Sequence, residues 1–190
     1  RALRVRANGL LAGFQGPRTI HLDIVDYPGE WLLDLALLDV DYAQWSAQVL
    51  HRIEGRDEAA AYRALVADTD AQAVLDEPTA QALAANFAGY LQTARANGYS
   101  DCTPGRFLLP GDLAGSPVLT FAPLPGDGGA RGSLLREMAR RFEAYKRKVV
   151  QPFFRDHFAK IDRQVVLVDA LGAIHQGPGS YTPLRAHETV

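Results

Sequence analysis

Apolar and polar residues alternate along the first part of the chain. Residues 1–7 alternate apolar and basic side chains and run into a turn at Asn8, which is typical of a half-buried strand. A second alternating stretch, residues 18–26, ends just before Pro28. The two stretches are joined by a loop, so we expect them to form neighbouring strands that pair antiparallel.

Three longer stretches have the apolar spacing of amphipathic helices. The first lies within residues 35–49, where apolar side chains recur three or four positions apart. The second starts near Pro78, which suits the first turn of a helix, and stops at Asn97. The third starts at Ser133, a helix-capping residue, and Pro152 is expected to kink or restart it.

Two further apolar runs are predicted to be strands. A short run at residues 118–121 lies inside a segment rich in glycine and proline. The run at residues 163–169 is continuously apolar in its middle, which is typical of a parallel strand covered on both faces. Asp169 ends this strand, either as part of a ligand site or as the cap of a following helix.

Composition narrows the function classes. Of the 190 residues, 47% are apolar, which is ordinary for a globular protein, and the net charge of -2 gives no reason to expect a nucleic-acid partner. Cys102 is the only cysteine, so it cannot form an intramolecular disulfide, which fits a reducing compartment, and we expect a packed thiol. No apolar run reaches the length of a membrane span.

The turn after the second predicted strand carries candidate chemistry. An aspartate at the tip of an apolar strand can hold Mg²⁺ through water, and a glycine three residues later can bring its N–H to a γ-phosphate. Asp26 and Gly29 have this spacing, and Glu30 follows as a candidate general base. A plain turn is the alternative, since aspartate and glycine are both turn formers. The same spacing at Asp112 and Gly115 has no clean strand before it and is interpreted as a loop.

Four segments together carry a family resemblance. They are residues 26–35, 41–46, 104–117 and 153–169. In this order they resemble the YcjX-like family of predicted P-loop ATPases and GTPases, stress-associated bacterial proteins of the cytosol, over roughly residues 1–178. The resemblance implies an α/β fold with a mostly parallel sheet and an α-helical insertion. It assigns residues 1–34 and 100–190 to the nucleotide-hydrolase domain and residues 35–99 to the insertion.

The resemblance also implies a reaction and a site. The intact cytoplasmic protein would hydrolyse ATP or GTP with Mg²⁺, and nucleotide would be its main partner. Asp26 would hold the metal, Gly29 would approach the γ-phosphate, and Glu30 would be the catalytic residue. Trp31 would belong to the same nucleotide-binding switch.

Two family elements have no counterpart in this chain. The phosphate loop, Gly-x-x-x-x-Gly-Lys-Ser/Thr, is absent, and the chain's lysines are Lys146, Lys148 and Lys160. The base-reading Thr-Lys-x-Asp element is absent too. Because that loop neutralises the phosphates, we expect the chain by itself neither to bind nor to hydrolyse nucleotide.

A second function class rests on the segment 131–148. It holds seven basic residues against Glu137 and Glu143, so the helical insertion and this basic helix could form a protein- or membrane-interaction module. The favoured interpretation is the solvated face of a docked helix, because the apolar seam is narrow.

His21 and Asp23 share a strand face and could bind a metal, although the solvent side of an amphipathic strand explains them better.

Overall fold

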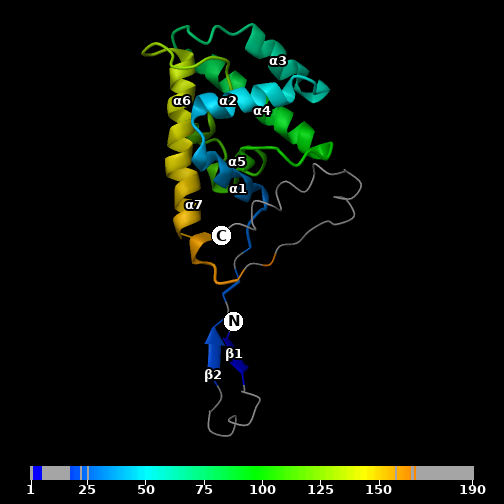
Figure 1. Ribbon diagram of the computed structural model, residues 1–190, viewed down its shortest axis with the longest axis vertical. Coiled ribbons are helices and arrows are strands. Elements are labelled where there is room, and N and C mark those ends of the chain that lie inside the picture. Colours follow the sequence, from blue (N-terminus) through cyan, green and yellow to red (C-terminus); the bar gives the residue numbers. More distant parts are fainter. Residues whose placement is uncertain are drawn as a thin grey trace.

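Helices make up most of the regular structure in the part of the chain that is described (Figure 1). The computed structural model describes residues 2–5, 18–21, 23–24, 26–156, 158–163 and 165. The α-helices are α1 (Glu30–Leu33), α2 (Tyr42–Ile53), α3 (Ala60–Ala67), α4 (Glu77–Ala96), α5 (Gly105–Leu108), α6 (Leu134–Tyr145) and α7 (Gln151–Asp156). Short 3₁₀ turns are η2 (Asp34–Asp39), η3 (Asp57–Ala59), η4 (Gly111–Leu113), η5 (Pro117–Leu119) and η7 (Phe158–Lys160). One π-helical segment, η6 (Lys146–Val150), joins α6 to α7.

The two N-terminal strands pair as predicted. β1 (Ala2–Val5) lies antiparallel to β2 (Arg18–His21), with Ala2 opposite His21. The second strand ends at His21 rather than Asp26, so the described residues between them are not part of the ladder. In Figure 1 this strand pair lies apart from the helical body.

The predicted α/β fold with a mostly parallel sheet is wrong. The only sheet among the described residues is the antiparallel pair of β1 and β2. The predicted strand at residues 118–121 is instead part of η5 followed by an extended buried segment. Pro117, Pro123 and Pro125 flank or follow it and cannot donate ladder hydrogen bonds. Of the predicted strand at residues 163–169, including Asp169, all but residues 163 and 165 lie outside the described residues.

Side chains satisfy the extended segment in place of a neighbouring strand. The Tyr42 hydroxyl donates to the Ala122 carbonyl at 2.8 Å, and the Ser46 hydroxyl donates to the Leu124 carbonyl at 2.6 Å. The Tyr62 hydroxyl donates to the Pro123 carbonyl at 2.5 Å. These donors come from α2 and α3, and they pair the carbonyl groups of three successive buried residues, 122–124.

The three long predicted helices are confirmed, although residues 35–39 of the first stretch lie in η2 and its α-helix, α2, begins only at Tyr42 behind a cap that was not predicted. Asp41 and Gln44 form a reciprocal capping box at the start of α2. Pro78 lies in the first turn of α4, and Ser133 caps α6 through the Arg136 N–H. The interruption of the last helix lies at η6, ahead of Pro152, which itself lies inside α7.

One aromatic core joins the helices. Trp45 of α2 stacks on Phe142 of α6 with ring centroids 4.8 Å apart and meets Phe87 of α4 edge-on at 6.0 Å. Phe121 of the extended segment meets Trp45 at 5.7 Å. Residues from 37–94 and from 102–150 thus share one core. No helix in the described ranges is both long and apolar enough to cross a membrane.

Candidate functional site

The turn of residues 26–31 leads from the strand pair into the helical body. Pro28 accepts a hydrogen bond from the Trp31 N–H at 3.1 Å, and Gly29 accepts one from the Leu32 N–H at 3.0 Å. Asp26 is exposed, and among the described residues its carboxylate has no hydrogen-bond or ion-pair partner. Asp26 therefore faces solvent, whereas Tyr27 packs edge-on against Phe153 of α7 and the end of the turn starts α1.

The fold itself gives no reason for glycine at position 29. Its backbone is right-handed helical, with φ -59° and ψ -27°, a conformation open to any residue. A Cβ built on Gly29 would have no atom within 4 Å. As the residue before the first helical one, Gly29 also has an N–H that no helical bond uses. A side chain at position 29 would therefore enter open space, so packing among the described residues does not require glycine.

Glu30, the predicted catalytic residue, contacts α4. One carboxylate oxygen accepts from Arg95 at 2.9 and 3.2 Å. Partial burial raises the pKa of Glu30, but a hydrogen bond from its own backbone and the bond and charge of Arg95 outweigh burial, so the pKa lies below its ordinary value. Glu30 is therefore a charged hydrogen-bond acceptor at neutral pH rather than a strong base.

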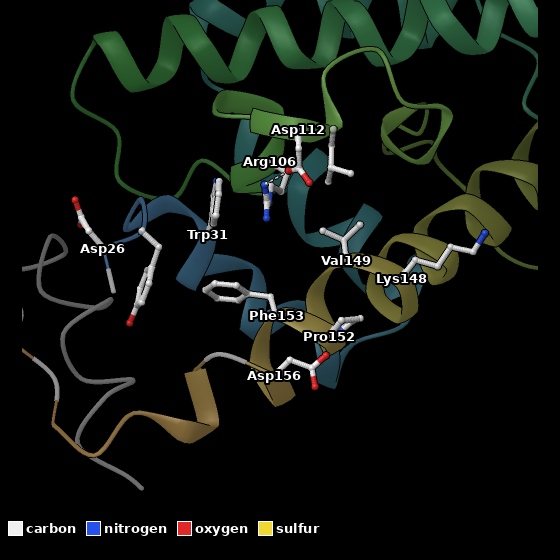
Figure 2. A pocket seen from close by; sticks show the side chains of 11 residues that line it. Asp26, Trp31, Arg106, Asp112, Lys148, Val149, Pro152, Phe153 and Asp156 are labelled. Atoms are coloured by element: carbon white, nitrogen blue, oxygen red, sulfur yellow. Dashed lines mark hydrogen bonds and ion pairs between the residues drawn. The ribbon is translucent and has the colours of Figure 1, made fainter. Parts of the chain in front are cut away.

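Trp31, the other predicted switch residue, is an anchor. Its indole N–H donates to the Leu109 carbonyl at 3.0 Å. The Arg106 guanidinium lies 3.3 Å from the centroid of its ring, and Phe153 of α7 meets the ring edge-on at 6.0 Å. Figure 2 shows Arg106 beside Trp31 and Phe153 below it. Cation–π and aromatic contacts together hold the end of the turn on α5 and α7.

A cavity of about 310 Å³ lies beside the turn (Figure 2). Its lining comes from the turn, from the segment around α5 and η4, and from η6 and α7. The lining residues are Asp26, Tyr27, Trp31, Arg106, Asp112, Leu113, Lys148, Val149, Pro152, Phe153 and Asp156. The cavity thus brings Asp26 and Trp31 together, whereas the Glu30 side chain is turned toward Arg95 on α4.

The second Asp-x-x-Gly segment lies at the same cavity. Asp112 accepts a hydrogen bond from Arg106 at 3.3 Å and is mostly exposed. It lies in a 3₁₀ turn and loop, as predicted, and it supports the arginine that covers Trp31. Asp112 thus contacts the turn of residues 26–31 through Arg106, which lies over the Trp31 ring.

Three residues of the site escaped the sequence-based prediction. They are Asp34, Arg95 and Arg106. Arg95 binds Glu30, Arg106 covers Trp31, and Asp34 binds Gly105 just after α1, so all three fix the position of α1. Asp34 carried a usable signal, because it is a lone acid among Leu32, Leu33 and Leu35. The two arginines are 65 and 75 positions from the residues they contact, and nothing in their local sequence marks them.

The geometry gives little support to the candidate metal pair, His21 and Asp23, or to a free interaction surface on the basic helix of residues 131–148. Within residues 26–156 and the other described ranges, no group of three or more His, Cys, Asp or Glu side chains could hold a metal ion. His21 and Asp23 are both exposed. On the basic helix, Arg141 pairs with Glu77 at 2.6 Å and Lys146 donates to the Val40 carbonyl at 2.6 Å. These contacts are those of a docked helix.

Comparison with known proteins identifies the family. The model of the YcjX-like family, DUF463, matches residues 2–187. A protein of Escherichia coli (strain K12) named Ras-like GTPase YcjX is 39% identical over 199 residues, which cover 97% of this chain and 42% of that protein. A protein of the same name from Shewanella oneidensis is 38% identical over 191 residues, covering 94% of this chain and 39% of that protein. The chain spans about two fifths of the length of these relatives. It belongs to the YcjX-like family.

Proposed function

We propose that the intact protein hydrolyses GTP and that the turn of residues 26–31 faces the γ-phosphate. The observation that carries this proposal is an exposed Asp26 without a hydrogen-bond or ion-pair partner among the described residues, three positions before a Gly29 whose Cβ position no described atom approaches within 4 Å. The name of the two relatives, Ras-like GTPase YcjX, supports GTP over ATP. The phosphate loop that would hold the rest of the nucleotide has no counterpart in this sequence.

Each residue of the turn then has a distinct task. Asp26 is a free carboxylate at the solvent side, suited to a water shell on Mg²⁺. Gly29 lets the phosphate approach its backbone N–H, where a side chain would stand in the way. Glu30 stays charged because its pKa is lowered, and to accept a hydrogen bond from the attacking water its carboxylate has to turn from Arg95 toward the cavity.

The donor set suits Mg²⁺ better than a metal held by protein ligands alone. Mg²⁺ keeps several waters and binds through one or two carboxylates together with substrate phosphates. A single exposed carboxylate such as Asp26 fits that pattern, given that the described residues form no larger metal-binding group. When bound, the ion would neutralise charge on the phosphates.

The decisive experiment uses Gly29→Ala in the intact protein. The backbone at this position accepts alanine without strain or contact, so thermal stability should stay equal or rise slightly. GTP turnover should nevertheless fall by about tenfold or more, because the methyl group separates the phosphate from the N–H. Phosphate release and thermal unfolding are measured on the same preparation.

Two matched controls make the result specific. Gly89→Ala introduces the same methyl group at an exposed position in α4, where nothing lies within 4 Å, and should leave turnover unchanged. Asp39→Asn is the control for Asp26→Asn. It removes an exposed carboxylate of η2, outside the proposed site, and should leave turnover unchanged. If Gly29→Ala and Asp26→Asn both turn over GTP at the rate of their controls, the proposed site is wrong.

A further inference from the structure

Asp34 is an acid buried where three elements meet. It is 3% exposed and lies in η2, directly after α1. One carboxylate oxygen accepts from the Tyr145 hydroxyl at the end of α6, at 2.5 Å. The other accepts from the Gly105 N–H at the start of α5, at 2.7 Å. One side chain therefore ties the segment after the turn to two helices that are remote in sequence.

The contact with Gly105 also reaches the beginning of α1. A Cβ at Gly105 would lie 2.1 Å from the Glu30 carbonyl oxygen, so the backbones of α5 and α1 are in direct contact. Glu30 begins α1 and Asp34 follows it, and Gly105 touches both. Because Gly105 has no side chain, α5 can hold the two ends of α1 at once.

Helix α1 has little else to fix it. It has four residues, and none of them is buried. A helix this short is not stable by itself and takes its position from tertiary contacts. Those contacts are the bonds of Asp34, the ion pair of Glu30 with Arg95, and the packing of Trp31.

A buried carboxylate is a costly way to obtain such a contact. Removing it from water disfavours its charged form, whereas an apolar side chain of similar size would pack there without that penalty. The gain is directional, since the carboxylate accepts from the Tyr145 hydroxyl and from the backbone of Gly105 and Arg106, and these bonds fix one arrangement of the three elements. Such a contact is useful where geometry matters more than stability.

We propose that Asp34 is a positioning residue for the turn of residues 26–31, acting through its hydrogen bonds to Tyr145 and Gly105. This inference rests on the proposed function of that turn. Losing the Tyr145 hydroxyl lets α1 move relative to α5 and α6, and with it Glu30 and Trp31. The phosphate-facing end of the turn then loses its fixed geometry, although every residue of the turn is still present.

The test reads the position of α1 without nucleotide. The intact protein is labelled with 5-fluorotryptophan, and the ¹⁹F resonances of Trp31 and Trp45 are assigned from Trp31→Phe and Trp45→Phe. Trp31 reports on α1, and Trp45 reports on the aromatic core. Tyr145→Phe should shift or broaden the Trp31 resonance more than the Trp45 resonance. Asp34→Asn, which keeps an acceptor for the Gly105 N–H, should have a smaller effect than Asp34→Leu.

Tyr62→Phe is the matched control. Tyr62 is equally buried and its hydroxyl donates to a backbone carbonyl, but it lies in α3, away from α1. It should leave the Trp31 resonance in place. An unmoved Trp31 resonance in both Tyr145→Phe and Asp34→Leu would overturn the proposal.

Turnover separates this proposal from the proposed function. Tyr145→Phe should lower kcat for GTP by about 10- to 100-fold with little change in KM, since misplacement of reacting groups by about 1 Å can cost that much. If Tyr145→Phe shifts the Trp31 resonance but leaves kcat unchanged, and Asp26→Asn is inactive, then the positioning role of Asp34 is wrong and the proposed function of the turn stands. If Asp26→Asn and wild type turn over equally, the proposed function fails, and the resonance shifts still decide whether Asp34 positions α1.

Discussion

The buried Asp34 should make the stability of the helical body fall as pH rises. Burial raises the pKa of this carboxyl from its ordinary 3.8 to about 6, and the hydrogen bonds from Tyr145 and Gly105 offset only part of that rise. The folded protein therefore holds the proton more tightly than the unfolded chain does. The resulting stabilisation is fully present below the unfolded pKa and is lost as pH rises through the folded one.

The two pKa values set the size of the effect. A difference between 3.8 and about 6 corresponds to about 3 kcal/mol over the whole titration. Between about pH 4.5 and about pH 8, a range that can be measured easily, about 2 kcal/mol of this should be lost. The group is almost completely buried, so solvent screening reduces the figure little.

The variant Asp34→Asn isolates this contribution. Glu30, Glu77 and Glu137 have lowered pKa values and act in the opposite direction, losing stability as pH falls. Their effects are common to both proteins and cancel when the variant is compared with wild type at each pH. The stability of Asp34→Asn relative to wild type should therefore rise by about 2 kcal/mol from about pH 4.5 to about pH 8.

Urea unfolding in a Trp31→Phe background provides the assay. Trp45 then reports by fluorescence on the core that α2, α4 and α6 share. For Asp34→Asn and its Asp34 parent, the unfolding midpoint and the slope of the unfolding free energy against urea concentration are measured at each pH. A change in that slope is then not mistaken for a change in stability. A stability difference that is the same at every pH would refute the assignment of Asp34 as a buried acid with a raised pKa.

Two further substitutions test the contact between α5 and α1 and the cap at the start of α6. Gly105→Ala should destabilise the protein by about 3 kcal/mol in chemical denaturation, because its Cβ would lie 2.1 Å from the Glu30 carbonyl oxygen and backbone cannot rotate away. Gly89→Ala, which meets no atom within 4 Å, is its control, and equal stability of the two variants would contradict the close approach of α5 to α1. Ser133→Ala should cost about 1 kcal/mol, since its hydroxyl accepts from the Arg136 N–H at the start of α6. Ser133→Asp should restore most of that loss, and a neutral Ser133→Ala would contradict the cap.

The helices could be predicted because their signals are local. Asp41 with Gln44, Pro78 and Ser133 mark helix starts within four residues of sequence, and the apolar spacing marks the buried faces. Each of these features depends on neighbours along the chain. The type of all three helices and the starts of α4 and α6 could therefore be predicted without knowledge of the tertiary contacts, whereas the apolar pattern within residues 35–49 did not separate η2 from the start of α2.

The fold class could not be predicted in the same way. An apolar run such as residues 118–121 fits a buried strand or any other buried segment, and its periodicity does not distinguish them. What decided its structure was a set of hydroxyl donors from Tyr42, Ser46 and Tyr62, which lie about 60 to 80 positions away. The parallel sheet was inferred from a family resemblance rather than from strand pairs in this chain, and the described residues contain none of its pairs.

The candidate site shows the same division between local and remote information. The spacing of Asp26 and Gly29 is a local pattern and could be found by inspection. Its assignment to nucleotide chemistry stays a prediction, and so does the division of the chain at residue 100. The contacts that hold the turn, from Arg95, Arg106 and Tyr145, depend on how distant helices pack and left no mark in the sequence near them.

The residues of the turn differ in how firmly their side chains are held, and this difference predicts how variants should behave. On the C-terminal side, Glu30, Trp31 and Asp34 bind residues of α4, α5 and α6. On the N-terminal side, Tyr27 packs edge-on against Phe153 with ring centroids 5.5 Å apart, whereas Asp26 is exposed and a Cβ at Gly29 would meet no described atom within 4 Å. Changes at the two exposed positions should therefore alter activity without altering stability, and changes at the three anchored positions should alter both.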